Sequence, residues 1–409
     1  MCRIKLNLLA AVGVLGSLTL ATGDAFAQEG PKLPIAPALQ TATPPRPAIP
    51  SIIQKYTVAP ANAADTPWSP AEASGTAPRL NFRKQDGSFL HMLPTLQGRA
   101  ALKAAQNATT QNATTPNKLQ STDDPDDPDD PASGSGSGSG GPVLYHGGPI
   151  MPIVTVYPIW WAPATLQTGA AAGFSPLYST LTLYLGAWFS QGHEASGLLT
   201  QYYQTINGVT SFYQNVGWLG GYYVDTRPLP ASGCSDPATP GNCITDAQME
   251  VEIWNVMHLN GWTPGFNKVF ILYTPNGEGT CYSPGICSGS GQQYCGYHSA
   301  FGPDGSPYIY AIIPFADPAG CLAGDVSPNG DPYADSAVQT SSHEISESAT
   351  DPLGTAWWDQ YGNEVADLCN DEVNDTWANN TASDMMNGWV FQIQALWSNH
   401  FGGCVQLTP

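Results

Sequence analysis

The residues whose types and spacing best suit chemistry are His343, Glu344 and Glu347, within the segment His-Glu-Ile-Ser-Glu. Residues four positions apart share one face of a helix, so His343 and Glu347 can point in the same direction. In the HExxH pattern of metallopeptidases, two such residues hold zinc and the inner glutamate is the general base. A carboxylate can also ligate zinc. We therefore predict a zinc site with His343 and Glu347 as ligands and Glu344 as catalytic base. The alternative is a helix surface with solvated side chains.

A zinc site of catalytic type needs a third protein ligand and an open position. We expect residues 357–368 to form a hairpin that turns at Gly362 and swings a carboxylate onto the metal. On a strand Glu364 and Asp367 would point to opposite faces, so we expect one of them to bind. Asp367 is the favoured ligand, with Glu364 and Asp351 as alternates. Asp351 lies where the helix must end, and it can instead cap or orient.

The motif lies in a predicted helix that begins at Asp331-Pro332 and must stop before Pro352, because proline disfavours helix at the residue before it. Strands are expected at 153–157, 269–273, 308–315 and 391–397, and further helices after Ser175-Pro176, over 196–206, and after a capping box of Thr245 with Gln248. Helices and strands do not alternate strictly. The sequence therefore predicts an α+β fold, or α/β with a mixed sheet.

Two other polar segments suggest weaker sites. Residues 325–331 resemble the start of a calcium loop, but the segment contains Pro328 and lacks a glutamate at position twelve. We expect a turn that leads into the helix, with calcium possible but disfavoured. Residues 295–298, Cys-Gly-Tyr-His, suggest a disulfide corner with a packed His298, and a ligand role for this histidine is the alternative.

Charge and targeting signals restrict the function. The chain has 13 basic and 33 acidic residues, a net charge of −20, and 11 of the basic residues precede residue 142. This balance argues against nucleic acid or an anionic membrane as partner. Residues 1–27 read as a signal peptide, with Arg3 and Lys5 before a short apolar run and Ala25-Phe26-Ala27 at its end. We expect a secreted, periplasmic or extracellular protein without membrane insertion.

Composition divides the rest of the chain at residue 142. Residues 28–141 are rich in Pro, Ala, Thr and Gln and end in an Asp/Pro run and a Gly/Ser run, which predicts a disordered, low-complexity propeptide or linker. Within this tract, residues 79–92 look most structured. We expect residues 142–409 to form the globular domain and the preceding tract to be dispensable for its fold.

Cysteine usage points to disulfides. Nine cysteines are present, and Cys2 is lost with the signal peptide. An even number in an exported domain predicts a disulfide framework, and a cysteine metal site has no paired CxxC motif to support it. Cys234–Cys243 is a plausible local loop, the other pairings stay open, and a bridge at Cys369 would help to pin the predicted hairpin. The eight remaining cysteines are Cys234, Cys243, Cys281, Cys287, Cys295, Cys321, Cys369 and Cys404.

These motifs together resemble a known family. The stretch from His343 to Pro352, then Trp357-Trp-Asp and residues 362–369, resembles bacterial exported proteins of the EXORDIUM-like (phosphate-induced protein) family. Residues 145–150, 295–298 and 328–331 fit the same resemblance, which covers residues 143–409. It implies a disulfide-stapled, zincin-like domain with an active-site helix that carries His343, Glu344 and Glu347.

The hypothesis that follows is an exported zinc metallopeptidase-like hydrolase acting on a peptide or cell-wall-associated substrate. Glu344 would take a proton from the attacking water while the metal polarises the scissile carbonyl. The main alternative is a non-catalytic extracellular or cell-surface binding protein with the same fold, and a further one is a glycan hydrolase that uses a carboxylate pair. The sequence does not indicate an oligomeric state.

Overall fold

The computed structural model describes residues 80–84, 88–102, 142–190, 194–236, 239–283, 286–288, 293–303, 305–324, 327–370, 391 and 393–405. The predicted signal peptide, the Asp/Pro run and the Gly/Ser run lie outside the described residues. Asp325, at the start of the possible calcium loop, also lies outside them.

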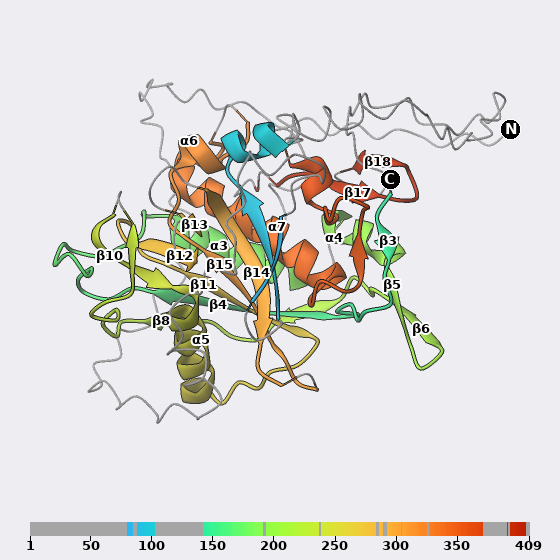
Figure 1. Cartoon of the computed structure of the whole chain (residues 1–409), viewed down its shortest axis with the longest axis horizontal. Coiled ribbons are helices and arrows are strands. Elements are labelled where there is room, and N and C mark those ends of the chain that lie inside the picture. The colour runs from blue at the N-terminus through green and yellow to red at the C-terminus, as the bar shows by residue number, and fades with distance from the viewer. Residues whose placement is uncertain are drawn as a thin grey trace, which may run out of the picture. The chain divides into compact units, whose positions relative to one another are not determined.

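A mixed sheet of eight strands forms the centre of the fold (Figure 1). Its order is β1-β2-β14-β15-β11-β4-β7, and β8 also pairs with β4. The pairs β15–β11, β11–β4, β4–β7 and β4–β8 are parallel, whereas β1–β2, β2–β14 and β14–β15 are antiparallel. The strands are β1 (Asn81–Arg83), β2 (Phe89–Pro94), β4 (Val154–Trp161), β7 (Gly217–Leu219), β8 (Tyr223–Asp225), β11 (Lys268–Tyr273), β14 (Tyr294–Phe301) and β15 (Tyr308–Ile313).

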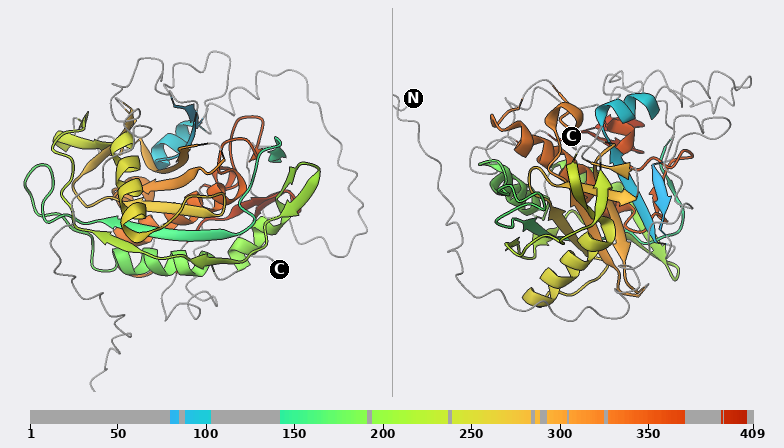
Figure 2. Two further views of the ribbon diagram at one scale, coloured as in Figure 1. Left: turned by 90° about the horizontal axis from the view of Figure 1, so that it is seen from below. Right: turned by 60° about the vertical axis from the view of Figure 1, so that its left-hand side comes forward.

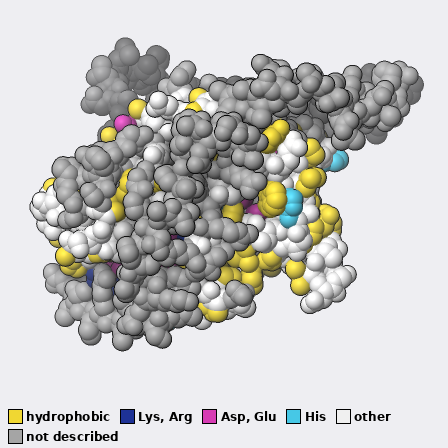
Figure 3. All heavy atoms as spheres, viewed as in Figure 1, with side chains coloured by type: hydrophobic (Ala, Val, Ile, Leu, Met, Phe, Trp, Pro, Cys, Tyr) yellow, Lys and Arg dark blue, Asp and Glu magenta, His cyan; other side chains and the backbone are white. Residues whose placement is uncertain are grey.

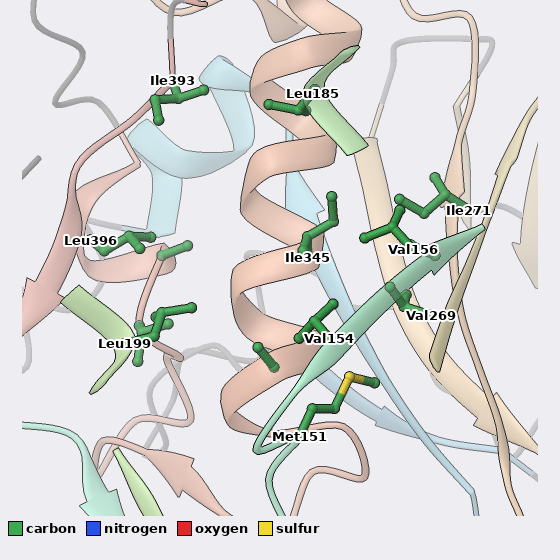
Figure 4. Packing of buried hydrophobic residues seen from close by; sticks show 14 of the residues in the cluster. Met151, Val154, Val156, Leu185, Leu199, Val269, Ile271, Ile345, Ile393 and Leu396 are labelled. Atoms are coloured by element: carbon green, nitrogen blue, oxygen red, sulfur yellow. The ribbon is translucent and has the colours of Figure 1, made fainter. Parts of the chain in front are cut away.

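Helices cover both faces of the sheet. Alternate residues of each strand point to opposite faces, so each face carries side chains that can pack against a helix. On one face, α3 (Tyr178–Ser190) and α7 (Pro332–Thr350) pack against β4 and β11. Ile345 of α7 lies in this core near Val154 and Val156, as Figure 4 shows. On the other face, α5 (Asp246–Asn260) packs against Tyr157 and Ile159 of β4. Figure 2 shows the arrangement from two further directions.

The local signals in the sequence set the ends of the helices as predicted. Asp331 caps α7 by accepting a hydrogen bond from the backbone N–H of Ala334 at 3.2 Å, and the helix ends at Thr350. Thr245 and Gln248 form the predicted capping box at the start of α5. The strands expected near 153–157, 269–273 and 308–315 are present as β4, β11 and β15. The predicted mixed α and β fold is confirmed.

Shorter elements surround this core. β3 (Leu144–Tyr145) pairs with β16 (Trp357–Trp358), β5 (Tyr203–Ile206) with β6 (Val209–Phe212), and β17 (Leu396–Ser398) with β18 (Gly403–Val405). A four-stranded sheet contains β9 (Cys234–Asp236), β10 (Thr239–Thr245), β12 (Gly279–Ser283) and β13 (Ile286–Cys287). The remaining named helices are α4 (Glu194–Gly197), η2 (Leu198–Gln201), α6 (Pro318–Cys321) and η3 (Asp367–Cys369).

The predicted start of the domain at residue 142 is too late. Residues 81–94 form the β1–β2 hairpin, and β2 pairs antiparallel with β14 inside the main sheet. Every residue of β2 is buried. The tract around this hairpin has a low-complexity composition, which favours a prediction of disorder. The partner strand β14 lies about 200 residues later in the chain, and such long-range pairing leaves no local signal beyond the short apolar run at 89–93.

Two other local predictions also need correction. Residues 196–206 do not continue as one helix, since α4 and η2 end at Gln201 and β5 follows. Residues 357–368 do not form a hairpin at Gly362. Instead the Asp359 side chain accepts hydrogen bonds from the backbone N–H groups of Tyr361 and Asn363, which folds the segment into a compact turn before η3.

All eight cysteines of the domain lie at disulfide distance in four pairs, which fits an oxidising compartment. The predicted Cys234–Cys243 pair is among them. Cys369, two residues after Asp367, pairs with Cys404 and so ties η3 to β18. The other two pairs are Cys281–Cys287 and Cys295–Cys321.

Within the described residues, no helix is both long and apolar enough to cross a membrane. On the face drawn in Figure 3, the described surface shows mainly hydrophobic and uncharged side chains, with few Lys, Arg, Asp or Glu. This agrees with a charged fraction of 11% in the sequence.

Candidate metal centre

The three motif residues of α7 point into the protein. His343, Glu344 and Glu347 are each 0% exposed, so the alternative of a solvated helix surface is wrong. One helical turn separates the two outer residues, and Nε2 of His343 lies 2.9 Å from Oε2 of Glu347. The helix therefore brings a histidine and a carboxylate together on its inner face, as their spacing predicts.

Four side chains from three parts of the chain converge at this point. The possible ligand atoms of His91, His343, Glu347 and Asp367 all lie within 4.8 Å of one another. Nε2 of His91 is 2.7 Å from Oδ2 of Asp367 and 3.5 Å from Oε2 of Glu347. Ligands about 2.0–2.2 Å from a tetrahedral zinc stand about 3.4 Å apart. The 3.5 Å separation matches this value, whereas the separations of 2.7 and 2.9 Å are hydrogen-bond distances that would have to lengthen around an ion.

Hydrogen bonds fix both histidines in the tautomer that a metal requires. Nδ1 of His91 donates to the side-chain oxygen of Asn81, and Nδ1 of His343 donates to the side-chain oxygen of Gln394 at 3.2 Å. The NH₂ groups of Asn81 and Gln394 donate to backbone carbonyls at 2.8 and 2.7 Å, which orients each amide with its oxygen toward the histidine. An amide oxygen can only accept, so in the neutral rings Nε2 carries the free lone pair.

The turn after β16 places both downstream carboxylates at the site. The backbone N–H of Glu364 donates to Oδ2 of Asp367 at 2.9 Å, and the backbone N–H of Asp367 donates to Oε1 of Glu347 at 3.2 Å. Glu364 reaches Nδ1 of His91 at 3.4 Å. The expectation that these two carboxylates point to opposite faces is therefore wrong, because they do not lie on a strand. Asp367, the favoured third ligand, is grouped with His343 and Glu347.

A second group lies beside the first. The possible ligand atoms of His298, Glu344 and Glu347 lie within 4.8 Å of one another. His298 comes from β14, and Gly296 two residues earlier lets α7 approach that strand closely. A Cβ atom at Gly296 would meet Cγ2 of Thr340 at 2.5 Å and Oε1 of Glu344 at 2.9 Å. His298 is therefore more than the packed corner histidine expected from the sequence.

Asp351, the other alternate ligand, has a structural role. Its Oδ1 accepts hydrogen bonds from the backbone N–H groups of Thr355 and Ala356 at 2.6 and 2.8 Å. It belongs to neither group of possible ligands. It therefore organises the turn that follows α7, which is the capping role considered from the sequence.

Burial and mutual repulsion shift the pKa values of the carboxylates. Burial raises the pKa values of Glu344, Glu347 and Glu364 well above the ordinary range, and neighbouring carboxylates raise them further. Asp367 is the exception. Burial acts to raise its pKa, but the charge of His91 and a hydrogen bond from that ring outweigh burial and lower the pKa. A bound cation would compensate the negative charge of such a buried cluster.

The three histidines titrate differently. Burial lowers the pKa of His343 to about 4 and that of His298 well below its ordinary range, so both rings are neutral near pH 7. Burial also acts to lower the pKa of His91, but Asp367 and Glu347 outweigh it and raise the pKa. Imidazole nitrogens and carboxylate oxygens together are a ligand set for Zn²⁺ and related divalent ions.

Sequence reasoning missed His91 as a possible ligand, as well as Asn81 and Gln394, which are hydrogen-bonded to the two histidines. The available signal was a single histidine within the apolar run Phe-Leu-His-Met-Leu of residues 89–93. The remaining group of possible ligands, Cys234, Cys243 and Cys281, consists of cysteines at disulfide distance from a partner. A disulfide leaves no thiolate for a metal. In the segment that resembles the start of a calcium loop, Asp331 caps α7, as expected for a turn that leads into the helix.

Comparison of the chain with protein-family models, with curated proteins and with solved structures gave no match. The resemblance to the EXORDIUM-like family therefore stays a prediction, as does the zincin-like architecture. The buried His, Glu and Asp residues of the two groups could hold a metal ion.

Proposed function

We propose that this chain is an exported, zinc-dependent hydrolase that acts on peptide bonds. His91, His343, Glu347 and Asp367 would hold the ion. The observation that carries the proposal is the pair of histidines whose Nδ1 atoms donate to fixed amide oxygens, while both Nε2 atoms face Glu347 and Asp367. Orienting partners of this kind are the usual surroundings of metal-binding histidines.

Two further carboxylates supply the acid–base chemistry. In the described part of the chain, the carboxylate oxygens of Glu344 and Glu364 are buried and have no hydrogen-bond partner. Each lies beside the proposed ligands, and either can take a proton from the attacking water and deliver it to the leaving amine. The bound ion would polarise the scissile carbonyl and stabilise the charge that develops on it. Zincin-like organisation, with the base on the ligand-bearing helix, would assign this role to Glu344.

The test uses the full chain, purified without chelators. We expect bound transition metal by elemental analysis and slow cleavage of fluorescently labelled casein. Chelation should abolish the cleavage and added zinc should restore it. His343→Ala should lose both metal and cleavage, whereas His146→Ala, a change to an exposed histidine outside the site, should keep both. A wild-type protein that neither contains nor binds zinc would overturn the proposal.

A second function is favoured by one observation, the burial of the site. The four proposed ligands are all buried, and structural zinc sites are closed whereas catalytic ones keep an open position. The alternative is therefore a non-catalytic extracellular binding protein that the ion stabilises. It predicts that zinc binds and raises the melting temperature, that no peptide is cleaved, and that Glu344→Gln and Glu364→Gln leave function unchanged.

A further inference from the structure

One buried histidine of the site, His298, is not among the proposed zinc ligands. His298 is 0% exposed, and within the described residues neither of its ring nitrogens has a hydrogen-bond partner. Leaving a buried polar group without a partner costs about 1–3 kcal/mol. Both oxygens of Glu344 are also buried and without a hydrogen-bond partner. Two adjacent side chains with unused ligand atoms indicate a position for a ligand.

Glu347 connects this position to the first one. Its Oε2 lies 2.9 Å from Nε2 of His343 and 3.8 Å from Nε2 of His298. It belongs to both groups of possible ligands. A carboxylate shared by two ions about 3.5–4 Å apart is a regular feature of two-metal hydrolytic sites.

The acidic side chains of the site outnumber its positive neighbours. Glu344, Glu347, Glu364 and Asp367 are all buried, and Arg99 is a positive neighbour of Glu344. Uncompensated charge is costly in a buried region, which favours bound cations beside these carboxylates.

We propose that the site binds two divalent metal ions that share Glu347. The first is held by His91, His343 and Asp367, and the second by His298 and Glu344. This inference rests on the proposed function and deepens it. It makes Glu344 a ligand, which leaves Glu364, 3.4 Å from Nε2 of His298, as the carboxylate that accepts the proton.

The stoichiometry of metal binding tests the proposal. The full chain is stripped with a chelator, reloaded with zinc, dialysed and analysed for metal, with protein determined by amino-acid analysis. We expect two equivalents in the wild type and in His146→Ala. His298→Ala and Glu344→Gln should each keep one. Glu364→Gln should keep two equivalents and lose at least about a hundredfold in cleavage rate, because general-base catalysis contributes about 10²–10⁴-fold.

The outcomes separate this inference from the proposed function. One equivalent in the wild type, unchanged in His298→Ala, would overturn the second site and leave the zinc hydrolase intact. No bound metal would overturn both. A second measurement does not depend on the folding of variants. Wild-type protein loaded with two equivalents of Mn²⁺ should give an exchange-coupled electron paramagnetic resonance spectrum, and a spectrum of isolated ions would contradict a shared Glu347.

Discussion

His91 and Asn81 are direct partners across the β1–β2 hairpin, and the side-chain oxygen of Asn81 accepts a hydrogen bond from Nδ1 of His91. The hairpin thus supplies both a possible ligand and the group that orients it. β2 also pairs antiparallel with β14, and in that register His91 lies opposite His298. One strand register therefore positions two of the three histidines of the site.

The first prediction concerns His91. His91→Ala should lower the affinity for zinc at least tenfold, because it removes a ligand whose orientation the fold has already set. The change is measured by zinc titration of stripped protein and by the rise in melting temperature on adding zinc. His146→Ala is the control and should behave as wild type. Equal zinc stabilisation of His91→Ala and wild type would exclude His91 as a ligand.

A second prediction concerns the orienting amides. Gln394→Leu should weaken zinc binding about 10–100-fold, since it removes the acceptor that holds Nδ1 of His343. Gln394→Glu keeps an acceptor at the same place and should retain most of the affinity. If the two variants bind zinc equally, the hydrogen bond does not orient His343.

The third prediction concerns the close approach of α7 to β14. Gly296→Ala should destabilise the fold by about 1–3 kcal/mol, because the new methyl group would overlap Thr340 and crowd Glu344. Urea unfolding measures the change. Gly305→Ala is the matched control, since a Cβ atom there meets nothing within 4 Å, and it should be close to neutral. Equal stability of both variants would mean that the helix can move away without cost.

The fourth prediction is a pH dependence of the metal-free protein. Burial raises the pKa of Asp351 from 3.8 to about 7. Between these values the folded protein binds more protons than the unfolded chain, so stability falls as the pH rises from about 4 to 7, by up to about 4 kcal/mol. Asp351→Asn keeps the oxygen that accepts from the turn and should remove this part of the pH dependence. Parallel pH profiles of the free energy of unfolding for the two proteins would contradict the assignment.

A fifth prediction follows from the corrected boundary. A chain that begins at residue 142 lacks β1 and β2, which leaves the edge of β14 uncovered and removes His91. Exposed strand edges promote association. This chain should aggregate and bind less zinc than one that begins at residue 79, as size-exclusion chromatography and zinc titration would show. A monomeric, zinc-binding 142–409 fragment would restore the original boundary.

The elements that carry local signals could be predicted from the sequence. Asp331 and Pro332 mark the start of α7, Pro352 limits its end, and the spacing of His343 and Glu347 puts them on one face. These inferences need only propensities and periodicity, which act over a few residues. The preference for Asp367 rests on a predicted hairpin that the structure does not contain, although Asp367 does lie in the group with His343 and Glu347.

The rest of the site depends on contacts between distant segments. His91 lies 252 residues before His343, and no local pattern states that β2 pairs with β14. Residues 359–363 form a turn rather than the predicted hairpin, because the Asp359 side chain binds backbone N–H groups that a strand ladder would use. Pairing partners and side-chain turns of this kind are settled by tertiary structure.

The separation of His91 from Asp367 and Gln394 also fixes when the site can exist. A ribosome makes the chain from its N-terminus at about 5–20 residues per second, so β2 is finished well before the segment that carries Asp367. Until β14 and α7 have also been made, β2 lacks its partner strand and His91 lacks all of its proposed co-ligands. An ion held by His91, His343, Glu347 and Asp367 could therefore be bound by all four residues only after nearly the whole chain has been made.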